Sequence, residues 1–141
     1  SFYNSFREYI GNATFDLDGT GTAFYMALHT SAASALVNTK TLSTQASLAN
    51  EVASGNGYTT GGASVTSRTW ASVATDKYRF DSTAVVWTAT GGAISNIKYA
   101  VIYQAGGKLV CFSKLSTSQF TLAEDNTLTV TPSASGIFEL A

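Results

Sequence analysis

The feature that most constrains the fold is the shortness of the apolar segments. After Gly11, apolar and β-branched residues come in short runs, and Gly, Asn, Asp or Pro closes nearly every run. Such runs, with turn residues recurring at close intervals, are typical of β-strands. A chain of this kind buries its apolar faces by stacking sheets. We therefore predict an all-β fold, an antiparallel β-sandwich or jelly roll.

The segment 99–103, Tyr-Ala-Val-Ile-Tyr, is apolar throughout and predicts a strand that is buried on both faces. Val85 and Trp87 are expected in the same core, and the Ala-Gly-Gly sequence at 105–107 predicts a hairpin. We expect residues 31–46 to form a surface loop and 47–52 a short strand or helical turn. The predicted strands are 22–30, 63–70, 77–80, 84–89, 97–104, 108–113, 120–122, 127–131 and 136–140.

The N-terminal segment has a different period. Phe2, Phe6, Tyr9 and Ile10 fall at helical spacing, and Gly11-Asn12 ends the pattern. We predict a helix or arm over residues 1–11 and one β domain over 1–141, without an internal repeat or a linker. The apolar stripe would either pack on its own sandwich or reach a neighbour. The candidate contact residues are Phe2, Tyr3, Phe6, Tyr9 and Ile10.

Composition and charge argue against a nucleic-acid-binding protein and against a membrane-spanning helix. Charged residues make up 12% of the chain, against about 25% in typical soluble domains. The net charge is −1, and the eight Lys and Arg residues are scattered, so no nucleic-acid partner is predicted. No apolar run approaches the ~18 residues of a membrane span, and no signal peptide is expected. Ser1 fits removal of an initiator Met from a protein that is made inside a cell.

Residues 15–20 read Phe-Asp-Leu-Asp-Gly-Thr, the sequence that also opens haloacid-dehalogenase phosphatases. Their chemistry needs the motif at the end of a buried parallel strand, with a helix after it. Here polar residues precede the motif and a strand pattern follows, so we interpret Asp16 and Asp18 as turn residues. An EF-hand is excluded because its twelfth position is Ala27. A looser cation site at the two aspartates remains an alternative.

No other set of residues predicts catalysis. His29 lies in an apolar strand pattern and is expected in the core or at its rim. Cys111 is expected to be a small buried apolar residue. One His and one Cys cannot build a zinc site or a disulfide. The glycines at 55, 57, 61 and 62 lack the Lys of a phosphate-binding loop and predict backbone with positive φ. We predict no enzyme, no metal and no cofactor.

The order of the segments adds a resemblance that covers nearly the whole chain. The segments that carry it are Phe-Tyr-Met-Ala-Leu-His-Thr at 24–30, Asn-Glu-Val at 50–52, Gly-Asn-Gly-Tyr-Thr-Thr-Gly-Gly-Ala at 55–63, Phe-Asp at 80–81, Val-Val-Trp at 85–87 and Tyr-Ala-Val-Ile-Tyr at 99–103. This pattern resembles a family of small virion proteins of tailed bacteriophages, many of them capsid decoration (cement) proteins. The most specific segments, 50–63 and 99–103, have the character of structural motifs.

The resemblance implies a protein on the outside of an icosahedral capsid that binds the major capsid protein and clamps neighbouring capsomers. Such proteins often form trimers, so it also implies a homo-oligomer. The alternative is a β module of a head or tail fibre that binds host surface glycan. A glycan-binding module would present exposed aromatic side chains, for which Trp70, Trp87 and Tyr58 are the candidates. Core packing is the alternative for all three, and the apolar run around Trp87 favours it there.

Overall fold

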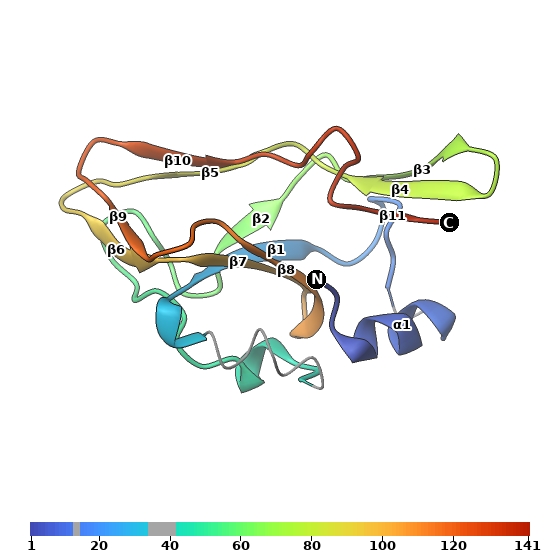
Figure 1. Cartoon of the computed structure of the whole chain (residues 1–141), viewed down its shortest axis with the longest axis horizontal. Helices are drawn as coiled ribbons and strands as arrows, with labels where there is room; N and C mark the ends of the chain where they lie inside the picture. The colour runs from blue at the N-terminus through green and yellow to red at the C-terminus, as the bar shows by residue number, and fades with distance from the viewer. Residues whose placement is uncertain (13–14, 34–41) are drawn as a thin grey trace.

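The computed structural model describes residues 1–12, 15–33 and 42–141. Antiparallel strands make up most of it, with one short helix, α1 (Asn4–Gly11), at the N-terminus (Figure 1). The prediction of an all-β sandwich preceded by a helix is therefore confirmed. Two single 3-10 turns, η1 (Ser31–Ala33) and η2 (Gln45–Ser47), belong to the segment expected as a loop, and residues 34–41 of that segment lie outside the described residues.

The strands follow the predicted order with shifted ends. In the described part of the chain they are β1 (Phe24–His29), β2 (Ala63–Val65), β3 (Thr69–Ala74), β4 (Lys77–Asp81), β5 (Val85–Thr88), β6 (Ile94–Ile97), β7 (Tyr99–Gln104), β8 (Lys108–Lys114), β9 (Phe120–Leu122), β10 (Thr127–Val130) and β11 (Phe138–Leu140).

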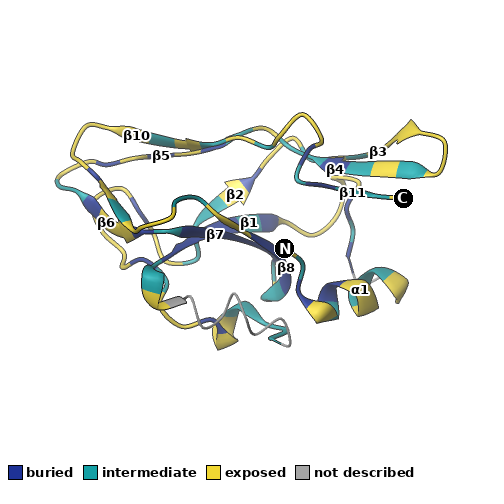
Figure 2. Ribbon diagram, in the orientation of Figure 1, coloured by how far each residue is buried: buried dark blue, intermediate teal, exposed yellow. Residues whose placement is uncertain are grey.

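The first layer is a four-stranded antiparallel sheet in the order β2-β1-β7-β8. β7 lies at its centre, paired with β1 from Gln104 opposite Phe24 to Tyr99 opposite His29. β7 and β8 form the hairpin that the Ala-Gly-Gly turn predicted. Every residue of β7 is buried, as expected for the apolar 99–103 segment (Figure 2).

The second layer contains two smaller sheets, β11-β4-β3 and β10-β5. Figure 1 shows these strands along one side of the molecule, facing β1, β7 and β8. The pair β6-β9 joins the layers, because β6 leads from β5 into β7 and β9 leads from β8 into β10.

The four-stranded sheet has a core on each face. Alternate residues of β1 and β7, such as Phe24, Met26 and Ile102, point into the first core, between the layers. Their neighbours Ala27 and Val101 point into the second core, on the other face. There Tyr3, Leu42 and Leu48 cover the sheet and pack against its own side chains Tyr25, Tyr103, Leu109 and Phe112.

Two predicted boundaries are wrong for the same reason. The single strand expected at 63–70 is two strands, because the chain passes from β2 in the first layer to β3 in the second, through Ser67 with φ 51°. The strand expected at 97–104 is preceded by β6, which we did not predict. At Lys98 the chain changes partners: its N–H donates to His29 O (2.9 Å) and its carbonyl accepts from Leu115 N (2.8 Å).

We predict that Val101→Asp prevents folding. Val101 is 4% exposed in the second core, and an unpaired buried carboxylate costs a large part of the roughly 5–15 kcal/mol that stabilises a domain. The matched control is Val86→Asp, at an apolar side chain in β5 that is 51% exposed. Circular dichroism should show a cooperative thermal transition for the control alone, and a folded Val101→Asp variant would contradict the burial of β7 on both faces.

Candidate functional site

The N-terminal segment is bound to the edge of β8. The amino group of Ser1 donates to Phe112 O (2.8 Å), Phe112 N donates to Ser1 O (2.9 Å), and Tyr3 N donates to Val110 O (3.3 Å). Phe2 forms an antiparallel bridge with Cys111. Residues 1–3 therefore act as a short additional strand that covers this edge of the first layer.

Aromatic contacts continue from this segment into the second layer. The rings of Phe2 and Phe6 stack with centroids 4.8 Å apart, and both contact the ring of Phe138 in β11 edge-on. Tyr3 and Phe6 are each 1% exposed, whereas Tyr9 and Ile10 are partly buried against the first core. The segment thus ties β8 to β11.

This arrangement bears on the candidate contact residues Phe2, Tyr3, Phe6, Tyr9 and Ile10. The stripe packs on the chain's own sandwich, one of the two arrangements considered from the sequence. The buried side chains of Tyr3 and Phe6 offer no surface to a partner in this conformation. A contact of the segment with a capsid or a second subunit stays a prediction.

Asp16 and Asp18 lie in the connection between α1 and β1. Asp18 Oδ1 accepts hydrogen bonds from Thr20 N (2.9 Å) and Thr20 Oγ1 (2.7 Å), the geometry of a capped turn. These bonds lower the pKa of Asp18, whereas a hydrogen bond shared with Asp18 raises the pKa of Asp16. The surroundings differ from the strand-then-helix context that the phosphatase chemistry needs.

The Asn-Glu-Val segment serves a structural role centred on Glu51. Its Oε1 accepts hydrogen bonds from Tyr58 Oη (2.6 Å) and Gly61 N (2.6 Å), and its Oε2 accepts one from Gln45 Nε2 (3.1 Å). Tyr58 Oη in turn accepts from Leu28 N (3.0 Å). Burial, with the bond to Glu51, raises the pKa of Tyr58. The carboxylate thus joins β1, the 55–62 turns and the η2 turn.

The glycines at 55, 57, 61 and 62 all have positive φ, as predicted. Two of them also allow close backbone approach. A Cβ at Gly57 would collide with Thr88 O, and one at Gly62 would collide with Met26 O. These two glycines are therefore required by close backbone packing, Gly57 against β5 and Gly62 against β1.

The three aromatic residues considered for glycan binding have different surroundings. Tyr58 is 2% exposed and Trp87 is 4% exposed, so both belong to the first core. Trp70 is only partly buried. Of the three candidates, Trp70 alone reaches the surface.

Trp70 belongs to an aromatic row that extends beyond the core. Phe80, Phe138 and Trp70 lie on one face of the β3-β4-β11 sheet, and the ring of Trp70 stacks on that of Tyr78, with centroids 5.4 Å apart. Tyr78 is 47% exposed. Leu140 is half-buried and lies beside Tyr78 on the same face, at the paired position of β11. We call Trp70, Tyr78 and Leu140 the Trp70–Tyr78 platform. Sequence analysis found Trp70 but missed Tyr78.

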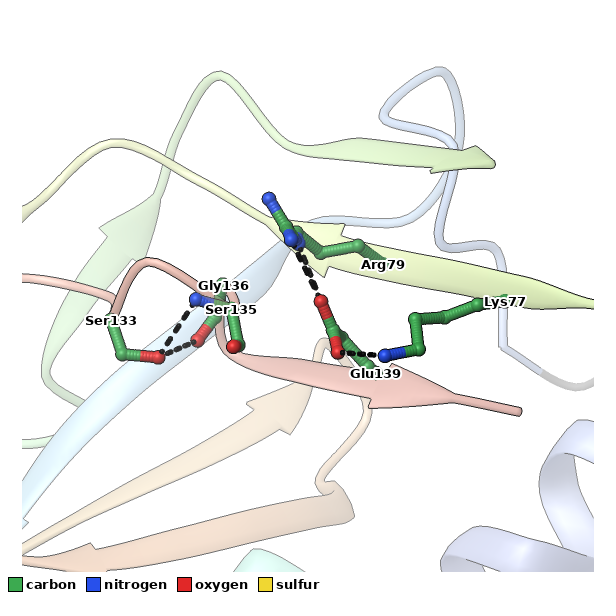
Figure 3. A network of polar contacts seen from close by, with 6 residues as sticks. All are labelled: Lys77, Arg79, Ser133, Ser135, Gly136 and Glu139. Carbon is green, nitrogen blue, oxygen red and sulfur yellow. Dashed lines mark hydrogen bonds and ion pairs between the residues drawn. The ribbon is translucent and has the colours of Figure 1, made fainter. Parts of the chain in front are cut away.

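The opposite face of the same sheet carries charge. Glu139 accepts hydrogen bonds from Arg79 Nη2 (2.7 Å), Arg79 Nε (3.0 Å) and Lys77 Nζ (3.1 Å), as Figure 3 shows. These bonds, above all those from Arg79, lower the pKa of Glu139. The nearby turn at Ser133 is closed by Gly136 N donating to Ser133 O (2.8 Å). One face of this sheet therefore carries the apolar platform, and the other face carries the ion pairs.

His29 and Cys111 are core residues, as predicted. His29 is fully buried with Nδ1 3.3 Å from Ala49 O, and burial lowers its pKa. Burial raises the pKa of Cys111 to about 12, so the thiol stays protonated at neutral pH. A pocket of about 500 Å³ that is open to solvent lies between the layers, with apolar residues such as Met26 and Val130 and polar residues such as Ser113 and Thr131 in its lining.

Within residues 1–12, 15–33 and 42–141, His, Cys, Asp and Glu side chains form no group of three or more that could hold a metal ion. None of the helices in the described part of the chain has the length and hydropathy for crossing a bilayer. Comparison with protein-family models, curated proteins and solved structures finds no match.

We predict that Phe6→Ala lowers the free energy of unfolding by about 3–5 kcal/mol, the usual cost of removing a buried phenyl ring. Phe6 contacts Phe2, Phe15 and Phe138, so its loss opens the junction between the layers. The control is Arg7→Ala on the exposed side of the same helix. Urea unfolding of both variants measures the free energy of unfolding. A decrease of less than 1 kcal/mol for Phe6→Ala would contradict the role of the N-terminal segment in joining the layers.

We further predict that Glu51→Ala lowers the free energy of unfolding by about 1–3 kcal/mol, because the Tyr58 hydroxyl and the Gly61 N–H lose their acceptor. Glu124→Ala, in an exposed turn, provides the matched control. Equal midpoints for the two variants in thermal unfolding would argue against the proposed role of Glu51.

Proposed function

We propose that this protein is a bacteriophage capsid decoration protein, which binds the assembled icosahedral capsid and stabilises it by bridging neighbouring capsomers. The observation that supports this best is the Trp70–Tyr78 platform, an aromatic surface that lies outside the sandwich core. The resemblance of segments 50–63 and 99–103 to tailed-phage virion proteins supports the same proposal.

The platform has the chemistry of a protein-binding anchor. Tyr and Trp are enriched in the central contacts of interfaces, since a large ring buries much area at a low cost in conformational entropy. Trp70 is held by its contact with Phe138, and Tyr78 is held by stacking on Trp70. Both rings are therefore oriented before a partner arrives, which reduces the cost of binding.

The low charge of the chain is consistent with a surface that becomes covered. Charged residues make up 12% of the sequence, and Lys77 and Arg79 both pair with Glu139. The proposed partner is the major capsid protein, and the proposed location is the capsid exterior after synthesis in the host cytoplasm. The absence of enzymatic activity and the homo-oligomeric state stay predictions, and the trimer is what the resemblance implies.

A glycan-binding module of a head or tail fibre is the second candidate function. One observation favours it: Trp70 and Tyr78 present a stacked aromatic pair at the surface, a feature suited to packing against a sugar ring. Because Tyr58 and Trp87 are buried, such a site would depend on the platform alone.

We predict that Tyr78→Ala weakens binding to capsids that lack the protein by at least about 30-fold, corresponding to about 2 kcal/mol for a central aromatic contact. Its thermal midpoint should stay close to wild type, because the side chain is 47% exposed. Co-sedimentation with capsids measures the affinity. Val86→Ala, at an exposed apolar side chain elsewhere in the same layer, should bind like wild type.

Wild-type protein that fails to bind such capsids would refute the decoration proposal. Equal capsid affinity of wild type and Tyr78→Ala would refute the role of the platform. A glycan array that retains the wild type but not Tyr78→Ala, combined with no capsid binding, would establish the fibre alternative.

A further inference from the structure

Strand β10 has one free edge. It pairs with β5 on one side, in the register Thr127–Thr88, Leu128–Trp87, Thr129–Val86 and Val130–Val85, and it pairs with no strand of the described chain on the other side. Figure 1 shows β10 along the rim of the molecule. A free edge offers backbone groups that another strand can bind.

The ladder identifies which backbone groups are free. Ala89 N donates to Asn126 O (2.9 Å), which makes Thr88 and Thr127 a non-hydrogen-bonded pair of the antiparallel ladder. Hydrogen-bonded and non-hydrogen-bonded pairs alternate, so Leu128 and Val130 direct their N–H and C=O groups toward β5. Those of Thr127 and Thr129 point away from β5, and Thr131 continues the same alternation.

This edge lacks the features that usually prevent edge-to-edge pairing. Residues 127–131, Thr-Leu-Thr-Val-Thr, contain no charge and no proline, and the β5–β10 register has no bulge. Neighbouring edges differ, since β3 has a register shift at Ser72–Ala74 and β11 carries Glu139. The edge of β8 is covered by residues 1–3. The edge of β10 is therefore open and uncharged, and in the described chain its partner β5 likewise has a second side that pairs with no strand.

We propose that two copies of the chain pair antiparallel through β10, about a two-fold axis at Thr129. The sequence Thr-Leu-Thr-Val-Thr is self-complementary about its centre. Thr129 faces Thr129 of the second copy, and Thr127 faces Thr131. These facing residues are the ones with free backbone groups, so the pairing forms about six N–H···O bonds.

The side chains match in the same register. The facing threonines share the exposed face of the sheet, while Leu128 faces Val130 of the second copy on the core side; both are cross-strand pairs that stabilise sheets. With no charged residue from 127 to 138, two copies meet without like-charge repulsion. The β10-β5 pair becomes part of a continuous four-stranded sheet.

Pairing also gives the proposed decoration protein two anchors, a consequence that rests on the proposed function. β10 runs along the long axis of the molecule, and the platform strands β3 and β4 lie beyond its C-terminal end (Figure 1). Antiparallel pairing reverses the long axis of the second copy. The two Trp70–Tyr78 platforms then lie at opposite ends of the pair, where each can contact a different capsomer, and two linked contacts bind more tightly than one.

Sedimentation equilibrium of the purified protein tests the pairing without any capsid. Wild type should be a dimer. Thr129→Pro should raise the dimer dissociation constant by about tenfold or more, because it removes N–H groups at the two-fold axis and none that bonds β5. Thr129→Lys should do the same by placing like charges opposite each other. The control is Thr88→Lys in β5, the strand next to β10. This variant should remain a dimer, because Thr88 lies away from the proposed interface.

Hydrogen exchange of the wild type provides a second measurement that needs no variant. The amides of Thr127, Thr129 and Thr131 should exchange slowly in concentrated protein and rapidly after dilution to monomer. A monomer at all concentrations, a trimer, or a dimer that both Thr129 variants leave intact would overturn the proposal. Because no capsid is present, such a failure leaves the decoration function to be judged by capsid binding.

Discussion

The rest of the structure depends on the burial of β7 on both faces. β7 lies between β1 and β8, and all six of its residues are buried, so the four-stranded sheet needs a cover on each side. The second layer covers one face, and Tyr3 with the segment around Leu42 and Leu48 covers the other. The lone cysteine cannot cross-link the chain, so packing between these covers stabilises it.

The two layers have different lengths, and this difference creates the exposed aromatic surface. The core row of Phe80 and Phe138 ends beneath α1, but β3 and β4 extend the same face to Trp70 and Tyr78. Tyr78 is 47% exposed and stacks on Trp70, so its ring keeps area that a partner could bury. The same layer leaves the uncharged edge of β10 open, so the two contacts that we propose, platform and edge, both belong to this layer.

Local patterns were sufficient for the fold class. Period-2 runs and turn residues predicted most strands, and the apolar 99–103 segment predicted double-sided burial, because these signals depend on near neighbours in sequence. The break between β2 and β3 and the presence of β6 were missed, since changes of sheet depend on distant partners such as His29 for Lys98. Tyr78 was missed because alternation in a strand tells which face a residue occupies, but not where the opposing layer ends.

The most direct test of the decoration proposal is a high-resolution electron cryomicroscopy map of the virion that contains this chain. We expect density for the sandwich on the outer surface of the capsid, with Trp70 and Tyr78 against the major capsid protein and neighbouring capsomers bridged. Density for the chain at a tail tip or fibre end would contradict the account, and so would a capsid position in which the platform faces solvent.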